Sequence, residues 1–221
     1  RTESLTPEQL TKVTPELMNL CEAGNGFSFT ELERASCYHA LGHLSMFLSG
    51  GDVDAATEIC DVVAGRKGIE YETTCYEGTF MQIFQPLEPE DIVLVQDLPV
   101  KTKQDAQAFC DRFLGDRQAA CHRESRPLYG TLTRPQDLEA FCSLVPGETY
   151  KRDCYLAMLF ALTPYLNYDI EALTTLCTGV PEERTAQCFS NAAGRFVESD
   201  YRLAEEAVAL CDRAATYGVG D

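Results

Sequence analysis

Residues 137–155 read Asp-Leu-Glu-Ala-Phe-Cys-Ser-Leu-Val-Pro-Gly-Glu-Thr-Tyr-Lys-Arg-Asp-Cys-Tyr and contain the plan of the whole chain. Apolar residues recur at helical spacing up to Cys142, and Pro146-Gly147 then interrupts the pattern. A second apolar stripe runs from Thr149 to about Thr163 and includes Cys154. These features predict two helices joined by a short turn, with one cysteine on each side of the turn.

The same arrangement occurs five times along the chain. A cysteine that ends an amphipathic run is followed 11 to 16 residues later by a second cysteine, and then at once by a ring. The later repeats are offset by about 34 residues, which is the period of two-helix solenoid repeats. We therefore predict an all-α fold, in which residues 1–221 form a single helical-repeat domain. This domain would be a solenoid of about five and a half hairpins, with second cysteines and rings at Cys37-Tyr38, Cys75-Tyr76, Cys121-His122, Cys154-Tyr155 and Cys188-Phe189.

Long, regular cysteine spacings are typical of disulfides, and no C-x-x-C spacing of a metal cluster occurs. Antiparallel helices bring the two cysteines of a hairpin to one level, within the separation that a disulfide requires. Each closed loop would contribute roughly 3 kcal/mol at most. Because disulfides persist in oxidising compartments, we expect a secreted, periplasmic or cell-surface protein. The predicted pairs are Cys21–Cys37, Cys60–Cys75, Cys110–Cys121, Cys142–Cys154 and Cys177–Cys188.

Composition excludes several classes of function. The formal net charge of −17 argues against nucleic acids and anionic membrane surfaces, because both require basic patches. No run of eighteen apolar residues is present, so we predict no membrane span. The given sequence contains no apolar segment of a secretory signal, and we interpret the chain from Arg1 as a mature or trimmed form whose signal peptide has been removed. We interpret the acidic, lysine-poor composition as the mark of a saline habitat or a GC-rich genome, and the alternative is a basic partner.

A resemblance rests on the hairpin period, on the cysteines that close each hairpin, and on Cys37-Tyr38-His39-Ala40-Leu41-Gly42 followed by Gly50-Gly51. In these features the chain resembles the cysteine-rich, tetratricopeptide-like repeat proteins of bacterial secretion, over nearly its whole length. The resemblance implies a concave binding surface with protein or peptide ligands. It implies no catalytic residues.

Residues 85–100 interrupt the repeat with about a dozen extra residues. This stretch contains Pro86, Pro89 and Pro99, and Ile92-Val93-Leu94-Val95 carries the strand signal of the chain. One interpretation is a tolerated surface insertion. The other, which we favour, is a binding loop or an exposed edge strand that docks on a partner or on the core.

His39 and His43 are two of the three histidines in the chain, and they stand four residues apart on a predicted helix. That spacing places both imidazoles on one face, within reach of one metal ion. His39 and Glu77 occupy equivalent places in successive repeats, so Glu77 would complete a zinc or copper site. Ala40 replaces the glutamate of the metalloprotease pattern, so hydrolysis of that kind is not expected. The alternative is that both histidines only pack, as we expect for the ring of His122.

Cys211 has no partner in the pattern. The run before it, Ala207-Val208-Ala209-Leu210, matches the end of the first helix in other hairpins, but no second helix with a cysteine follows. An odd cysteine in a secreted chain indicates a bridge between chains or a free thiol. We expect either a bridge to a second chain or a free thiol buried against the last hairpin, and we favour the buried thiol.

These observations predict an extracytoplasmic protein-interaction module or assembly subunit that uses a superhelical face and the 85–100 insertion. Its partner would be a protein, a peptide or a second copy of the chain. No phosphate-binding loop, nucleophile motif or acid–base pair indicates an enzyme. The alternative function is a metal-binding protein or metalloenzyme that uses His39 and His43.

Overall fold

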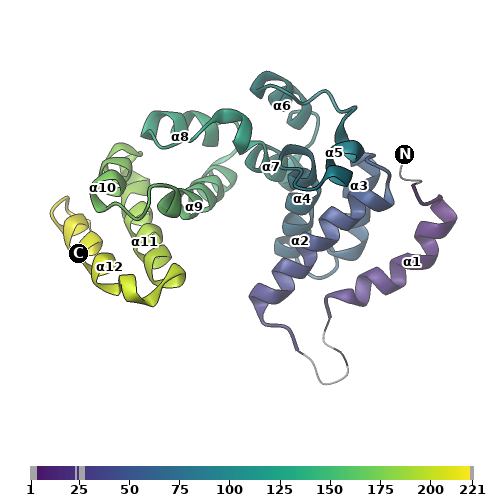
Figure 1. Cartoon of the computed structure of the whole chain (residues 1–221), viewed down its shortest axis with the longest axis horizontal. Helices are drawn as coiled ribbons and strands as arrows, with labels where there is room; N and C mark the ends of the chain where they lie inside the picture. Colours follow the sequence, from purple (N-terminus) through teal and green to yellow (C-terminus); the bar gives the residue numbers. More distant parts are fainter. Residues whose placement is uncertain (1–3, 23, 25–27, 220–221) are drawn as a thin grey trace. The chain divides into compact units, whose positions relative to one another are not determined.

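The computed structural model describes residues 4–22, 24 and 28–219, and within them the fold is all-helical with no strand. Two short 3₁₀ helices, η1 (Arg126–Tyr129) and η2 (Tyr201–Leu203), accompany the α-helices (Figure 1). The α-helices are α1 (Pro7–Leu20), α2 (Glu31–Leu48), α3 (Val53–Val63), α4 (Ile69–Phe84), α5 (Pro89–Val95), α6 (Lys103–Cys110), α7 (Gly115–Glu124), α8 (Pro135–Cys142), α9 (Glu148–Tyr165), α10 (Ile170–Gly179), α11 (Glu182–Ser199) and α12 (Ala204–Ala215).

The chain divides into two compact units, Arg1–Leu128 and Tyr129–Asp221. Unit 1 contains α1 to α7, and unit 2 contains α8 to α12. The single repeat domain over residues 1–221 therefore stays a prediction.

All five predicted cysteine pairs lie at disulfide distance. Their Cα atoms are 5.3 to 5.7 Å apart, which is the usual separation for a disulfide. Each pair joins two consecutive helices: α1 with α2, α3 with α4, α6 with α7, α8 with α9, and α10 with α11. Five hairpins, with α5 inserted between the second and the third, are therefore present as the cysteine spacing predicts.

In unit 1, α2 and α4 pack side by side with their backbones in contact (Figure 1). An added Cβ on Gly42 would lie 2.0 Å from the carbonyl oxygen of Cys75, and one on Gly78 would lie 1.9 Å from the carbonyl oxygen of His39. Glycine is therefore required at both places, because no side-chain atom fits between the two helices. On its other side α4 packs against α7.

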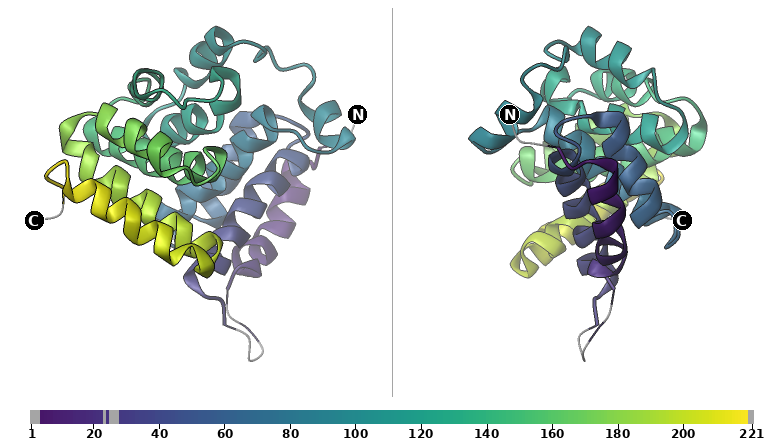
Figure 2. Two further views of the ribbon diagram at one scale, coloured as in Figure 1. Left: turned by 60° about the vertical axis from the view of Figure 1, so that its left-hand side comes forward. Right: turned by 90° about the vertical axis from the view of Figure 1, so that its right-hand side faces the viewer.

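Unit 2 also has a core of large buried side chains between packed helices. α11 packs against α9 and α12, and α12 also contacts α10 (Figure 2). The buried residues include Leu138, Tyr155, Leu173 and Phe196. Ala207, Leu210 and Ala214 are the buried face of α12.

In four hairpins the ring that follows the second cysteine is hydrogen-bonded to an acidic side chain near the first cysteine. Burial first, and then the neighbouring carboxylate, raises the pKa of each tyrosine in this role. The fifth hairpin has Phe189 at the ring position and Thr178 after its first cysteine. It therefore lacks both the hydrogen-bonding ring and the carboxylate of the other four. The pairs are Tyr38 with Glu22, Tyr76 with Asp61, His122 with Asp111 and Tyr155 with Glu139.

The edge strand expected within 85–100 is wrong, because Pro89–Val95 forms helix α5. Pro89 stands at the start of the helix, and the Asp91 carboxylate accepts hydrogen bonds from the backbone N–H groups of Leu87 and Glu88. These local signals favour a helix start. They prevail because the β-branched run has no neighbouring strand to pair with in unit 1 as described. No described helix combines the length and the apolar character that crossing a membrane requires.

Candidate functional site

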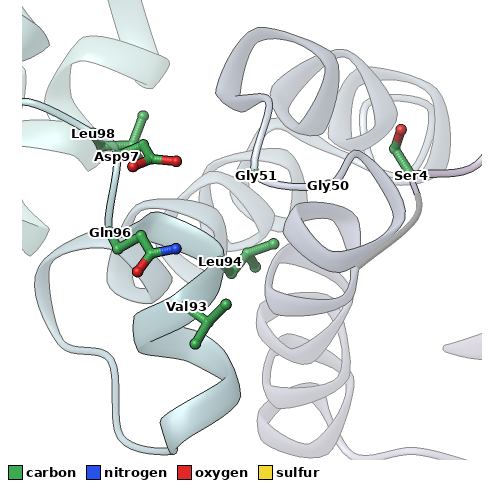
Figure 3. Close-up of a pocket in the computed structure, with 8 residues that line it drawn as sticks. All are labelled: Ser4, Gly50, Gly51, Val93, Leu94, Gln96, Asp97 and Leu98. Atoms are coloured by element: carbon green, nitrogen blue, oxygen red, sulfur yellow. The ribbon is translucent and has the colours of Figure 1, made fainter. Parts of the chain in front are cut away.

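The insertion lines a pocket in unit 1 with a volume of about 390 Å³. One wall is the turn between α2 and α3, beside the N-terminal segment, and the other wall is the end of α5 with the residues that follow it (Figure 3). Leu94 and Gln96 project toward the glycine turn. The residues lining the pocket are Ser4, Gly50, Gly51, Val93, Leu94, Gln96, Asp97 and Leu98.

Two glycines allow the walls to approach each other. Gly50 and Gly51 have φ of +65° and +86°, in the left-handed region that favours glycine. A Cβ on Gly51 would lie 2.6 Å from the carbonyl oxygen of Leu94. The first wall is held by the backbone N–H of Leu5, which donates to the carbonyl of Leu48 over 2.9 Å. The turn at Gly50 and Gly51 therefore follows the end of α2 and leaves room for the backbone of α5 to approach it.

α5 presents apolar side chains to solvent next to this pocket. Ile92 and Val93 are 53% and 51% exposed, and Val95 is the buried residue of the helix. Four acidic residues stand close to this segment in the sequence, at positions 88, 90, 91 and 97, and Asp97 lines the pocket. An exposed apolar surface next to acidic groups suits a partner that carries an apolar side chain next to positive charge.

The two histidines of the predicted metal site do lie together. The ring centroids of His39 and His43 are 5.1 Å apart. The contact at Gly42 and Gly78 places them against α4, where His39 Nε2 lies 3.3 Å from the Sδ atom of Met81. His43 Nδ1 lies 2.6 Å from the Oε1 atom of Gln82.

The surroundings of the His39 ring determine its protonation. Burial first, and then His43, lowers the pKa of His39 to about 4, so this imidazole is neutral at pH 7. α5 contacts the same cluster through Asp91. Burial raises the pKa of the Asp91 carboxyl, but the Glu88 N–H, the Gln82 amide, the Leu87 N–H and His43 together hold it below its ordinary value.

Glu77 does not join the histidines as the sequence predicts. Its carboxylate forms an ion pair with Arg123 of α7. Within the described ranges of the chain, no three His, Cys, Asp or Glu side chains are grouped so that they could hold a metal ion. The predicted ligand set His39, His43 and Glu77 is therefore not assembled, because equal places in successive repeats do not face each other across α2 and α4.

Glu77 belongs instead to a cluster of charged groups between α4 and α7. Burial raises the pKa of Glu77, although Arg123 opposes this effect. Burial, and then the charge of Glu77, raises the pKa of Glu124 to about 7. Gln85 donates its amide to Glu124 over 2.9 Å. This arrangement joins two helices of unit 1 and contains a carboxyl that titrates near neutrality.

His122 has the packing role expected of it. The ring is 1% exposed and its Nε2 atom lies 3.1 Å from an Asp111 carboxylate oxygen. Burial lowers the pKa of His122, while Asp111 opposes that shift. The ring therefore belongs to the contact between α6 and α7 rather than to the histidine cluster.

The preferred prediction for Cys211 is wrong. Its thiol is free and exposed, beside the buried Leu210. In the complete hairpins a second helix covers the equivalent cysteine and bonds to it. No second helix follows α12 in the part of the chain that the structure describes, so this face of α12 stays open. A bridge to a second chain stays a prediction.

Met81 and Gln82 are the members of the histidine cluster that were missed. The signal for them is the pair Gly42 and Gly78, which indicates where two helices touch and therefore which side chains lie beside the contact. The tyrosine–carboxylate pairs also had a signal. An acidic residue follows the first cysteine directly in the first three hairpins, at Glu22, Asp61 and Asp111.

Comparison with protein-family models, curated proteins and solved structures finds no match for this chain. The resemblance to tetratricopeptide-like repeat proteins of bacterial secretion therefore stays a prediction. The pocket beside α5 and the histidine cluster are the features of unit 1 that bear on function.

Proposed function

We propose that this protein is an extracytoplasmic protein-interaction module built on a disulfide-linked helical-repeat solenoid. Five cysteine pairs at disulfide distance support a secreted, periplasmic or cell-surface location, where such bonds persist. The packing of α2, α4 and α7 in sequence order, and of α9 on α11, supports stacking of successive hairpins.

The pocket beside α5 is the observation that carries the proposal. It lies where the chain departs from its repeat, and it is formed by residues from three separate segments. Inserted elements on a rigid scaffold are common places for binding. The covalently closed hairpins on either side of α5 hold the pocket walls in position, which limits the ordering cost of binding.

The chemistry of the pocket indicates the partner. Val93, Leu94 and Leu98 offer apolar contacts, and Asp97 lines the same space. The whole chain carries a formal charge of −17. We propose that the partner is a protein segment with an apolar side chain flanked by lysine or arginine, whose approach the acidic field accelerates.

A peptide library displayed on phage tests this proposal with the full chain. Selected peptides are synthesised and titrated by calorimetry against the parent and two variants. Val93→Lys places a cation at the pocket, whereas Val62→Lys makes the same change on α3 at a valine of similar exposure, 42% against 51%. We expect apolar–basic peptides that bind Val93→Lys at least about tenfold more weakly, bind Val62→Lys unchanged, and weaken with salt.

Three outcomes would overturn the proposal. The library could yield no peptide that binds the parent, or peptides that bind Val93→Lys as tightly as the parent. Sedimentation could also show that the parent assembles with itself through this surface, with Val93→Lys producing monomers. That last result would establish an assembly subunit instead.

A further inference from the structure

We infer that His39, His43 and Met81 form a binding site for copper(I). The site differs from the one that repeat equivalence predicts, because a thioether replaces the carboxylate of Glu77. It is independent of the pocket proposed to bind a protein segment.

The distance between two donor atoms supports the ligand set. His39 Nε2 and Met81 Sδ are 3.3 Å apart. Metal–nitrogen and metal–sulfur bonds of about 2.0 and 2.3 Å separate two such ligands by about 3.5 Å around a tetrahedral ion. The two atoms therefore already stand close to the separation that a shared ion requires.

His43, whose ring centroid lies 5.1 Å from that of His39, is the third ligand of the inferred site. The Gln82 Oε1 atom lies 2.6 Å from Nδ1 of His43, and an amide oxygen accepts, so this bond places the ring proton on Nδ1. Nε2 then keeps its lone pair. A hydrogen bond from the other ring nitrogen is the usual support of a metal-binding histidine. Gln82 is 3% exposed, so the packing around its side chain keeps the amide oxygen at this position.

The donors select the ion. Imidazole binds both zinc and copper, but a thioether is a soft ligand that suits copper(I), whereas the remaining ligands of zinc are thiolate or carboxylate. Glu77, the carboxylate expected here, is engaged by Arg123. The backbone contact at Gly42 and Gly78 fixes α2 against α4, so the three donors do not depend on a loop.

Copper(I) binding to the full chain tests the site. The exposed thiol of Cys211 would also bind copper(I), so every protein carries Cys211→Ser. Copper(I) is supplied as its acetonitrile complex without oxygen or thiols, in competition with bicinchoninate. We expect one tight ion per chain and at least a tenfold rise in Kd for His39→Gln and for Met81→Leu. Met18→Leu and His122→Phe, which change the same residue types outside the cluster, should leave Kd unchanged.

X-ray absorption at the copper edge provides a second measurement on the parent. We expect a sulfur neighbour that Met81→Leu removes, with circular dichroism confirming that the variant is folded. No copper(I) binding to the Cys211→Ser protein would overturn the inference. So would binding that Met81→Leu leaves unchanged, or a preference for zinc that depends on the histidines alone.

Discussion

Replacing Gly78 by alanine should destabilise unit 1 more than any exposed substitution. The new Cβ would lie 1.9 Å from the carbonyl oxygen of His39, and the obstructing atom belongs to the backbone, so no side chain can rotate away. α2 and α4 would have to separate by more than about 1 Å to restore an ordinary contact. Such overpacking costs about 3 kcal/mol, and alanine recovers about 1 kcal/mol through its higher helix propensity. The net loss is about 2 kcal/mol, or about 6–10 °C in Tm for a domain of this size.

The matched control is Gly194→Ala in α11. An added Cβ there meets nothing within 4 Å, so alanine should stabilise the protein by about 1 kcal/mol. Urea unfolding gives the free energies, and hydrogen exchange followed by mass spectrometry assigns the change to α2 and α4 or to α11. If Gly78→Ala raises stability as Gly194→Ala does, the two helices are not in backbone contact and the reasoning is refuted.

Three further predictions use the same measurements. Tyr155→Phe removes the hydrogen bond to Glu139 and should lower the free energy of unfolding by about 1–2 kcal/mol. Phe189→Tyr should also destabilise the protein, because no carboxylate follows Cys177 to accept a hydrogen bond from the new hydroxyl. Equal stability of both variants and the parent in urea would contradict these expectations. Glu124 keeps its proton up to about pH 7 when folded, against an ordinary pKa of 4.5, so the free energy of unfolding should fall as the pH rises from 5 to 8. The fall should be at most about 3 kcal/mol, and Glu124→Gln should remove it. If the urea midpoint of Glu124→Gln depends on pH as that of the parent does, the assigned pKa is wrong. Cys211 should react with a thiol reagent in the folded monomer, at one equivalent per chain, and a thiol that reacts only in denaturant would disprove its exposure.

The order of the helices and the five cysteine pairs were predictable because they depend on local sequence. Helix ends are specified by signals within a few residues, such as the capping box of Thr6 and Gln9 and the cap at Asp52. The pairing of two cysteines within one hairpin likewise depends only on the length of the turn between its two helices. Neither prediction requires knowledge of how one hairpin meets the next.

Predictions failed where they depended on how helices meet. Placing Glu77 beside His39 assumed that equal repeat positions lie at one level, but His39 contacts Met81, four residues later. Met81 lies one helical turn after Glu77, whereas His43 contacts Gln82, only one residue beyond its equal position Met81, so no single shift along α4 describes the contact. Which side chains of α4 meet α2 depends on the crossing at Gly42 and Gly78, two residues in different hairpins, and Glu77 instead pairs with Arg123 of α7.

The helix α5 shows a different kind of failure, in which a local signal was present but another was preferred. Glu88-Pro89-Glu90-Asp91 has the form of a helix start, as Thr6-Pro7-Glu8-Gln9 does. The run Ile92–Val95 suggested a strand because β-branched residues favour sheets. That preference requires a neighbouring strand, whereas a capped helix start requires only its own residues, so the capping signal should be given more weight in an all-helical chain.

The two places where chemistry is proposed are both departures from the repeat. A ring and a carboxylate recur around the disulfides of four hairpins, with tyrosine in three of them and His122 in the fourth, so these pairs indicate no particular ligand. His39 and His43 have no counterpart in the other hairpins, and α5 has none either. Asp91 of α5 lies close enough to His43 to affect its own pKa, so the two departures adjoin each other within unit 1. The regular positions of the repeat are occupied by disulfides and by the ring–carboxylate contacts between the two helices of a hairpin. Binding chemistry therefore has to come from residues that depart from the repeat, and in unit 1 these residues lie on α2, α4 and α5.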